Sequence, residues 1–285
     1  MPGTLYVVAT PIGNLEDVTL RALRVLREVA VIAAEDTRRT ARLLQHYSIS
    51  TPTTSLHEHN EQARTPGLIQ RLLGGESIAL VSDAGTPVIS DPGARLIAEA
   101  HRQSIRVEPI PGPSAVMAAL SASGIGGDGF VFAGFPPSRS KARKNWLEAL
   151  LKETRPVVLF EAPHRILDTL AELAIMVGTR KVAIGREITK KHEVLAVRPI
   201  NEWLSGPPIE RGEFTLVIEA PKVESGKPAV APLDSEIAAE FVQLTENKGL
   251  ERRAAIRELA SRHGANNREV FSALERHKKL VDRQN

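Results

Sequence analysis

Three polar clusters carry the side chains that could move protons or hold a substrate. Residues 35–39 read EDTRR, residues 57–60 read HEHN, and residues 186–192 read REITKKH. Carboxylates, imidazoles and amines are the groups that proteins use for acid–base work. We therefore predict acid–base or substrate-holding roles for these clusters. The simpler alternative, for Glu35 and Arg38, is local salt bridging and helix capping.

Metal and thiol chemistry have little support in the sequence. His57 and His59 are two residues apart, but no third ligand follows at a defined spacing, so no metal is predicted. The chain contains no cysteine, which excludes disulfides, thiolate metal sites and cysteine nucleophiles.

Four loops rich in glycine or proline follow predicted strands. Residues 10–14 read TPIGN, 83–87 read DAGTP, 109–114 read PIPGPS and 160–165 read FEAPHR. Ligands of open α/β sheets bind beyond the carboxyl ends of the strands, so four such loops favour a binding site. None of them matches the dinucleotide-binding or Walker A pattern.

The first 120 residues alternate between two kinds of apolar pattern. Short β-branched runs predict strands at 6–10, 29–34, 77–82 and 106–110. Helical spacing predicts helices at 15–29, 37–47, 61–73 and 93–101, the first with Asn14 as its N-cap. This alternation predicts a parallel α/β layer.

A second set of elements follows a glycine-rich stretch at 121–129. Strands are predicted at 130–135, 157–161, 181–186, 194–197 and 214–219, with helices at 141–152 and 165–177. The last strands follow one another closely, which predicts a sheet with antiparallel members.

Beyond residue 219 the composition changes. Residues 221–232 contain three prolines and predict an exposed linker. Three short helices are predicted at 234–244, 250–263 and 266–277, with the turn Gly264–Asn267 between the last two. A helix-turn-helix unit and a small helical cap on the main body both fit this pattern. The predicted domains are therefore 1–120, 121–222 and 233–285.

Composition places the chain among ordinary globular proteins. Of 285 residues, 42% are hydrophobic and 25% charged, which is enough apolar matter for a sizeable core and argues against disorder of the whole chain. The N-terminal segment has no basic region before a long apolar stretch, and no apolar run approaches the length of a membrane span. We expect a soluble, cytoplasmic protein.

The positive charge is concentrated near the C-terminus. The formal net charge is +3, and residues 245–285 alone net +4, with ten Lys and Arg against six acids, so residues 1–244 net −1. A second basic patch lies at 139–144, and a third at 190–191. Each run alone is more often a solvated helix face. Three of them together favour a polyanionic partner.

The loops and polar clusters together resemble one known family. The segments, in chain order over about residues 3–220, resemble the tetrapyrrole methylase superfamily and, more closely, its ribosomal RNA branch: TLYVVATPIGNLEDVTLRAL, AAEDTRRT, LHEHNE, LVSDAGTPVISDPG, PIPGPSA, FAGFPP, LFEAPHRI, GREITKKHE and GEFTLVI. The EDTRRT and HEHNE segments fit the RNA branch rather than the tetrapyrrole-binding members. The tail resembles the helix-turn-helix domain at the end of this branch.

The resemblance implies a fold and an activity. The expected fold is α/β: a parallel N-terminal domain, a mixed-sheet second domain, the cofactor in the cleft between them, and a small helical domain. The expected activity is S-adenosylmethionine-dependent methylation of a cytidine ribose 2'-hydroxyl in the decoding region of 16S rRNA, free or within the 30S subunit, by a homodimer. Two alternatives stay open: a methyltransferase of the same fold for a small tetrapyrrole or a modified protein residue, and a non-catalytic ribosome-associated RNA-binding protein.

The resemblance also suggests which residues contact the cofactor. The methionine end would meet the third-strand loop, Glu161 would lie near the adenosine, and Ile188 with Phe214 would help to close the site. The predicted cofactor-binding residues are Pro11, Ile12, Asp83, Ala84, Gly85, Thr86, Ile89, Ser114, Ala115, Phe160, Glu161, Ile188 and Phe214.

Methyl transfer to a hydroxyl needs alignment, and either a base for the hydroxyl proton or a cation beside the forming alkoxide. The sequence does not choose among the candidates, which are Glu35, Asp36, Arg38, His57, Asn60, Arg186 and Lys190. The predicted RNA-binding residues are Arg139, Lys141, Arg143, Lys144, Lys191, Arg252 and Arg253.

Overall fold

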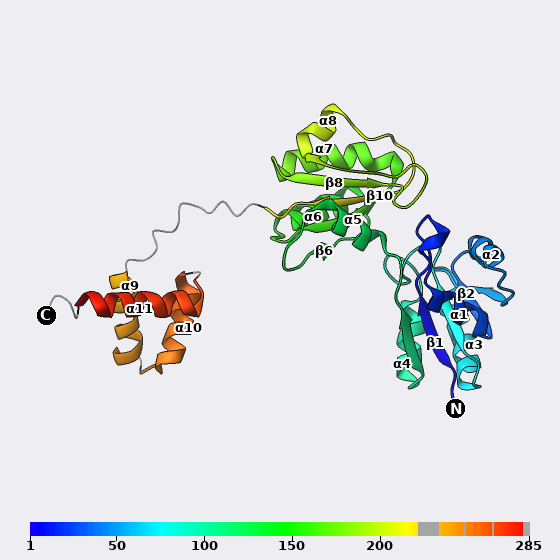
Figure 1. Cartoon of the computed structure of the whole chain (residues 1–285), viewed down its shortest axis with the longest axis horizontal. Helices are drawn as coiled ribbons and strands as arrows, with labels where there is room; N and C mark the ends of the chain where they lie inside the picture. The colour runs from blue at the N-terminus through cyan, green and yellow to red at the C-terminus, as the bar shows by residue number, and fades with distance from the viewer. Residues whose placement is uncertain (222–233, 248, 264, 282–285) are drawn as a thin grey trace. The chain divides into compact units, whose positions relative to one another are not determined.

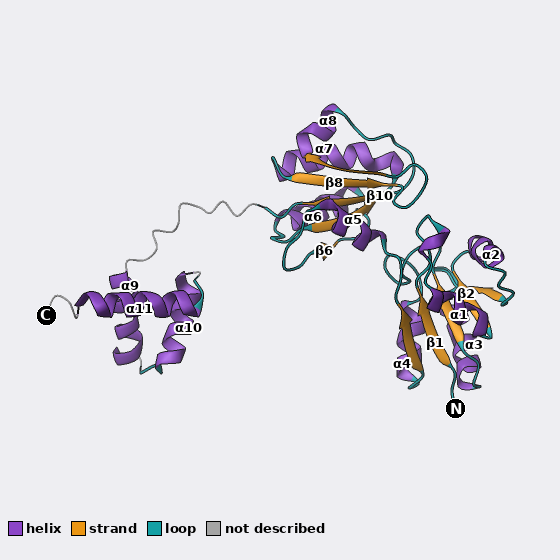
Figure 2. Ribbon diagram, viewed as in Figure 1, coloured by secondary structure: helices purple, strands orange, loops and turns teal. Residues whose placement is uncertain are grey.

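The computed structural model describes residues 1–221, 234–247, 249–263 and 265–281 (Figure 1). These residues form two compact units, one ending at Pro221 and one lying beyond it. The predicted linker at 221–232 lies, after Pro221, outside the described residues. Figure 2 shows that the first unit contains both strands and helices, whereas the second is helical.

A five-stranded parallel sheet forms the N-terminal half of the first unit. The strand order is β3-β2-β4-β1-β5, and every pairing between neighbours is parallel. The sequence did not predict β3, which is short, rich in threonine and at the sheet edge, so it lacks the apolar run of its neighbours. The strands are β1 (Thr4–Val8), β2 (Val31–Ala34), β3 (Thr53–Ser55), β4 (Ile78–Val81) and β5 (Arg106–Ile110).

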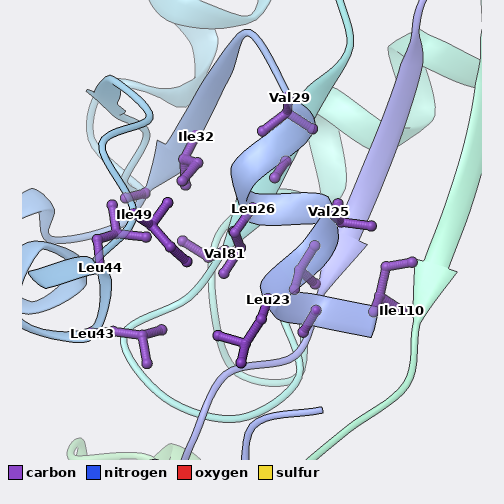
Figure 3. Close-up of a cluster of buried hydrophobic side chains, with 14 residues drawn as sticks. Leu23, Val25, Leu26, Val29, Ile32, Leu43, Leu44, Ile49, Val81 and Ile110 are labelled. Atoms are coloured by element: carbon purple, nitrogen blue, oxygen red, sulfur yellow. The ribbon is translucent and has the colours of Figure 1, made fainter. Parts of the chain in front are cut away.

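Helices cover both faces of this sheet. Side chains of α1 and α2 pack on one face around Leu26, Ile32 and Val81 (Figure 3). Side chains of α3 and α4 pack on the other face around Leu72, Leu80 and Leu96. The helices are α1 (Leu20–Glu28), α2 (Thr37–His46), α3 (Glu61–Leu73) and α4 (Ala94–Arg102).

The predicted helix at 15–29 is wrong in its first turn. Asn14 caps only a short 3-10 turn, η1 (Leu15–Asp17), and the backbone at Val18 and Thr19 is then extended. The Thr19 hydroxyl accepts a hydrogen bond from the Ala22 amide and so begins α1. Two good N-cap residues compete here, and the second one starts the helix.

The C-terminal half of the first unit is built on a mixed sheet of order β6-β7-β10-β8-β9. The pair β6–β7 is parallel and the other three pairs are antiparallel. This confirms the predicted α/β fold with one parallel and one mixed sheet. The strands are β6 (Val131–Phe132), β7 (Val157–Glu161), β8 (Lys181–Arg186), β9 (Val194–Pro199) and β10 (Phe214–Ile218).

Helices also cover both faces of the mixed sheet. On one face α5 packs through Val116 and Ala119 against Val158 and Val217. The other face is covered by α6, α7 and α8, with Leu170 and Trp203 in their core. The helices are α5 (Ala115–Ser123), α6 (Ser140–Leu151), η2 (Pro163–Arg165), α7 (Ile166–Val177) and α8 (Ile200–Ser205).

Helix α5 was not predicted, and its last turn occupies the start of the glycine-rich stretch at 121–129. Its sequence, AVMAALSAS, is small and apolar on every side, so it lacks the periodic pattern of an amphipathic helix. Ser114 begins this helix by accepting a hydrogen bond from the Met117 amide.

The second unit has an apolar core of its own. Ile237, Leu259 and Val270 are buried between its helices. All three predicted helices are present, although the first continues into a π-helical turn. Gly264 of the predicted turn lies outside the described residues. The elements are α9 (Asp234–Val242), η3 (Gln243–Asn247), α10 (Arg252–His263) and α11 (Asn267–Val281).

Candidate functional site

A cavity of about 300 Å³ lies in the first unit and is lined from both sheets. From the parallel sheet come the loops that follow the carboxyl ends of β1, β2, β4 and β5, which is where open α/β sheets bind ligands. The lining residues are Ile12, Glu35, Arg39, Asp83, Ala84, Gly85, Thr86, Ile89, Ser90, Asp91, Ser114, Ala115, Val116, Phe135, Phe160, Glu161, Ile188, Glu213, Phe214 and Thr215.

Backbone hydrogen bonds tie the loops of the parallel sheet together. The amides and carbonyls of Thr10 and Gly85 exchange two hydrogen bonds, each 2.9 Å long. The Thr86 hydroxyl donates to the Pro113 carbonyl at 3.2 Å. Gly85 has a φ of +81°, which glycine adopts without strain, and Ile12 lies directly against it. The three loops therefore form one floor rather than three independent turns.

A loop of the mixed sheet meets this floor directly. The Asn14 amide donates to the Thr189 hydroxyl at 3.1 Å. Gly13 is so close to the same loop that an added Cβ would lie 2.3 Å from Lys190 Cγ and 2.9 Å from Thr189 Oγ1. The loop 187–190 thus holds Ile188 at the cavity wall.

Both loops that flank the cavity hold non-glycine residues at positive φ. Val88 (74°) and Ser90 (67°) lie in the loop after β4, and Glu187 (53°) and Thr189 (68°) lie in the loop after β8. A β-branched residue such as Val88 adopts this conformation rarely and at a cost. Such strain gathers at functional sites because the surrounding structure must enforce it.

The polar part of the cavity is strongly acidic. Among the described residues that line it, Arg39 is the one cation, against five carboxyl groups: Glu35, Asp83, Asp91, Glu161 and Glu213. The Asp83 amide donates to Glu35 at 3.3 Å, and Arg39 is 3.3 Å from the Asp83 carboxylate.

Burial raises the pKa of two of these carboxyl groups. Burial, with smaller repulsion from Asp83 and Asp36, raises the pKa of Glu35. Burial and the neighbouring charge of Glu35 raise the pKa of Asp91 to about 6. Asp91 therefore holds a proton up to about pH 6, and the negative charge of this end of the cavity at higher pH suits a cationic ligand.

Glu161 is the centre of a buried ion-pair network. Its carboxylate accepts from the Ala162 amide at 2.7 Å, from Arg165 at 2.9 Å and from the Thr169 hydroxyl. Arg143 donates to the same hydroxyl and to Glu172, each at 2.7 Å. The carboxylate is fully buried, and its bond to Thr169 ties α7 to the end of β7. Arg143 of α6 joins this network through Thr169 and lies 3.9 Å from the carboxylate.

Comparison with known proteins identifies the fold and the family. A sequence model of the tetrapyrrole (corrin/porphyrin) methylases matches residues 4–203. The chain belongs to the tetrapyrrole methylase family. A relative from Pseudomonas aeruginosa, named ribosomal RNA small subunit methyltransferase I, is 47% identical and covers 83% of this chain and 87% of its own. A relative of the same name from Halalkalibacterium halodurans is 42% identical and covers 95% of this chain and 94% of its own.

Solved structures of this methylase fold are similar to the first unit. Diphthine synthase aligns with a TM-score of 0.59 at 16% identity, over 76% of this chain and 90% of its own. Uroporphyrin-III-C-methyltransferase from Thermus thermophilus aligns with a TM-score of 0.54 at 20% identity, over 76% of this chain and 94% of its own. The predicted tetrapyrrole methylase fold is confirmed.

Membership of this methylase family confirms the predicted cofactor, S-adenosyl-L-methionine. The cavity fits it in size, because small-molecule sites begin at about 300 Å³. It also fits in charge, because the carboxyl groups of Glu35, Asp83 and Asp91 line it and the ligand carries a sulfonium and an ammonium. Phe160 and Phe135, whose ring centroids are 5.4 Å apart, offer an apolar surface for an adenine ring.

The predicted cofactor-binding residues of the methylase come together in the structure. All line the cavity except Pro11, whose neighbour Ile12 does. The Glu161 carboxylate faces its buried network instead of the cavity. Their role in binding remains a prediction, but the structure shows that they share one site.

Of the predicted catalytic residues, only Glu35 lines the cavity. Asp36 caps α2 and binds Arg38 at 2.8 Å, which lowers the pKa of the Asp36 carboxyl well below its usual range. Three of the other four have polar partners: the Asn60 side chain accepts from the His57 amide, Arg186 donates to the His192 carbonyl, and Lys190 binds Glu187 and Glu213. The fourth, His57, has a buried Nδ1 atom with no hydrogen-bond partner among the described residues.

The predicted RNA-binding residues differ in exposure. Arg139, Lys141, Lys144, Lys191, Arg252 and Arg253 are exposed. Arg252 lies over the Phe271 ring and 3.6 Å from Glu275. The Arg143 side chain is 11% exposed and bound to Glu172 and Thr169, so its charge is already compensated inside the protein.

Of the residues that line the methylase cavity, seven were missed in the sequence, and Arg39, Asp91 and Phe135 are three of them. Each of these three lies in a segment quoted for the resemblance, namely EDTRRT, SDPG or FAGFPP. The sequence signal that could have revealed these three residues is a polar or aromatic side chain next to a loop rich in glycine or proline.

No described helix is long and apolar enough to cross a membrane. Within the described ranges, no group of three or more His, Asp or Glu side chains is arranged to hold a metal ion.

Proposed function

We propose that this methylase transfers a methyl group from S-adenosylmethionine to the ribose 2'-hydroxyl of a cytidine in the decoding region of 16S rRNA. The observation that carries the proposal is that Glu35 and Arg39, from the segment typical of the RNA branch, line the same cavity as the cofactor loops. The names of the relatives at 42–48% identity support small-subunit ribosomal RNA as the substrate class. The enzyme would act in the cytoplasm as a homodimer.

The bound cofactor supplies an electrophilic methyl group on a sulfonium, so the protein's task is alignment and proton removal. Glu35 is the proposed base. Its carboxylate takes the 2'-hydroxyl proton as the new oxygen–carbon bond forms and the carbon–sulfur bond breaks, with that electron pair remaining on sulfur. Its raised pKa makes it a stronger base than an exposed carboxylate.

Arg39 contributes to the same step through its positive charge. It lies beside Asp83 in the cavity, where its guanidinium stabilises negative charge as it develops on the ribose oxygen. Asp91 is close enough to Glu35 for the Glu35 charge to raise the pKa of Asp91, so the two carboxyl groups influence each other's protonation.

The deciding experiment is methyl transfer to 30S subunits and to naked 16S rRNA, followed by mapping of the modified nucleotide. Label on a cytidine ribose in the decoding region supports the proposal. Label on a base, on a tetrapyrrole or on a protein residue contradicts it, and failure of S-adenosylmethionine to bind in calorimetry would favour a non-catalytic RNA-binding protein.

The proposed base is tested with Glu35→Gln, for which we expect kcat to fall by about 10²–10⁴-fold. Cofactor affinity should stay within a few-fold. Glu58→Gln, an exposed glutamate outside the cavity, is the matched control and should retain full activity. Activity of Glu35→Gln equal to that of the control would rule out the assigned role.

A further inference from the structure

The outward face of α2 carries three arginines next to the cavity. Arg38, Arg39 and Arg42 are exposed, and they lie within the first six residues of the helix. Arg39 also lines the cavity. Figure 1 shows α2 beside β2, whose carboxyl end leads into the cavity through Glu35.

Within the part of the chain that the structure describes, these arginines have solvent-exposed partners or none. Arg38 donates two hydrogen bonds to the Asp36 carboxylate, at 2.8 and 3.0 Å, with its side chain 89% exposed, and Arg39 lies 3.3 Å from Asp83. For the Arg42 side chain, no hydrogen bond or ion pair to another described residue is found. Exposed pairs of this kind contribute at most about 1 kcal/mol, so a stronger anion can replace the carboxylates.

The spacing of the arginines is unfavourable for the isolated protein. Arg38 and Arg42 are four residues apart, which places two like charges on one face of the helix. Like charges at this spacing destabilise a helix unless a counter-charge lies between them. Over four residues the helix rises about 6 Å, comparable with the separation of neighbouring phosphates along a nucleic acid strand.

We propose that this face of α2 binds phosphates of the substrate RNA that flank the nucleotide being methylated. The inference rests on the proposed function, because it takes RNA as the substrate. A ribose that reaches the methyl donor must lie in the cavity, so its flanking phosphates lie just outside the cavity, and the exposed Arg38 and Arg42 are on the same helix as Arg39, which lines it. Guanidinium groups bind phosphate through two parallel hydrogen bonds, and Arg42 has no competing carboxylate among the described residues.

The proposal distinguishes α2 from the basic patches found in the sequence. Arg143 of the 139–144 patch is turned inward to Glu172. Arg38 and Arg42 face solvent and are linked to the cavity through the intervening Arg39. The RNA that contacts α2 would therefore be the segment next to the target nucleotide.

The test compares Arg42→Ala, Arg42→Lys and the double variant Arg38→Ala/Arg42→Ala with the full-length wild-type enzyme on 30S subunits and 16S rRNA. We expect KM for RNA to rise about 3–10-fold in Arg42→Ala and further in the double variant. The slope of log affinity against log salt should become shallower by about one unit for each phosphate that the variant no longer neutralises. Arg42→Lys should retain most of the salt slope, because it keeps the charge.

Cofactor affinity separates a contact with RNA from a structural role. The Kd for S-adenosylmethionine should stay within twofold of wild type in every variant, since neither Arg38 nor Arg42 lines the cavity. The matched control is Arg64→Ala, an exposed arginine on α3, which packs on the opposite face of the sheet. It should leave KM and the salt slope unchanged.

Two results would overturn the inference. If Arg42→Ala behaves like Arg64→Ala while wild type methylates RNA, the α2 face does not bind the substrate, although the proposed function stands. If the variants lose cofactor and RNA affinity equally, the arginines stabilise the cavity itself. Absence of RNA methylation by wild type would instead refute the proposed function.

Discussion

Asp91 illustrates how tertiary packing gives an ordinary residue an unusual property. In the sequence it is one acid in a Gly/Pro-rich loop, whereas in the structure it lines the cavity near Glu35 and Asp83. Partial burial raises its pKa from 3.8 to about 6. The folded protein therefore binds a proton that the unfolded chain releases between about pH 4 and pH 6.

This shift has a consequence for stability that Asp91→Asn tests. Because the folded-state pKa is raised, the free energy of unfolding falls as pH rises from about 4 to 6. Asp91→Asn removes this loss and should be more stable than wild type by about 1 kcal/mol at pH 7.5, after allowance for solvent exposure, with little difference at pH 4.5.

Urea unfolding followed by tryptophan fluorescence measures the effect, because Trp146 and Trp203 both lie in the first unit. Asp128→Asn, at an exposed acid, is the control. A stability difference that is the same at both pH values would contradict the assigned cause.

Arg143 and Lys144 are neighbours in one basic patch with opposite environments. The Arg143 side chain is bound to Glu172 and Thr169 in the network around Glu161, whereas the Lys144 side chain is 79% exposed. Arg143→Met should lower the free energy of unfolding by about 2–4 kcal/mol, because it leaves buried partners uncompensated. Lys144→Met should change it by less than about 0.5 kcal/mol. Equal effects in urea unfolding would mean that Arg143 is not held in the network.

At the scale of elements, most strands and helices could be predicted, because a buried strand and an amphipathic helix each give a recognisable pattern of apolar residues in the sequence. The elements Val157–Glu161, Lys181–Arg186 and Glu61–Leu73 have the predicted bounds. Three elements that were not predicted lack such a pattern: β3 is three polar or small residues, α5 is mostly small and apolar, and α8 is only six residues long. Their structure depends on a neighbouring strand and on burial against the second sheet.

The contact between the loops at 10–14 and 187–190 is an element-scale feature that Gly13→Ala tests. The added Cβ would meet Thr189 Oγ1 at 2.9 Å and the Ile188 carbonyl at 3.1 Å, neither of which can easily move. The loops should separate, and the Kd for S-adenosylmethionine should rise about tenfold, corresponding to the 1–3 kcal/mol of an overpacked contact.

Gly126→Ala is the matched control for this loop contact, since nothing lies within 4 Å of a Cβ added there. Calorimetric titration of both variants decides the question. Unchanged cofactor affinity in Gly13→Ala would show that the loop contact does not hold the cavity closed.

At the scale of the whole molecule, the first unit contains both sheets and the complete cavity, while the second unit has a separate core. We expect a chain ending at residue 222 to bind S-adenosylmethionine within about twofold of the full-length enzyme. Removal of the basic tail should raise KM for RNA at least tenfold and reduce its salt dependence.

Calorimetry for the cofactor and methyl transfer to 30S subunits over a range of salt concentrations provide the measurements. Equal decreases in cofactor and RNA affinity would mean that the tail supports the first unit structurally. An unchanged KM would mean that the tail does not bind the RNA and that the first unit does.

The sequence by itself determined the order and type of the main elements, the family resemblance and the loops that meet at the cavity. These follow from local patterns: apolar periodicity, capping residues, and Gly/Pro loops at strand ends. Only the tertiary structure decided which polar residues share the site. Glu35, Arg39 and Asp91 are far apart or inconspicuous in the sequence but line one cavity, whereas Asn60 and Lys190 are bound to neighbouring residues and do not line it. Burial and pairing depend on residues distant in the chain, so no local pattern reports them.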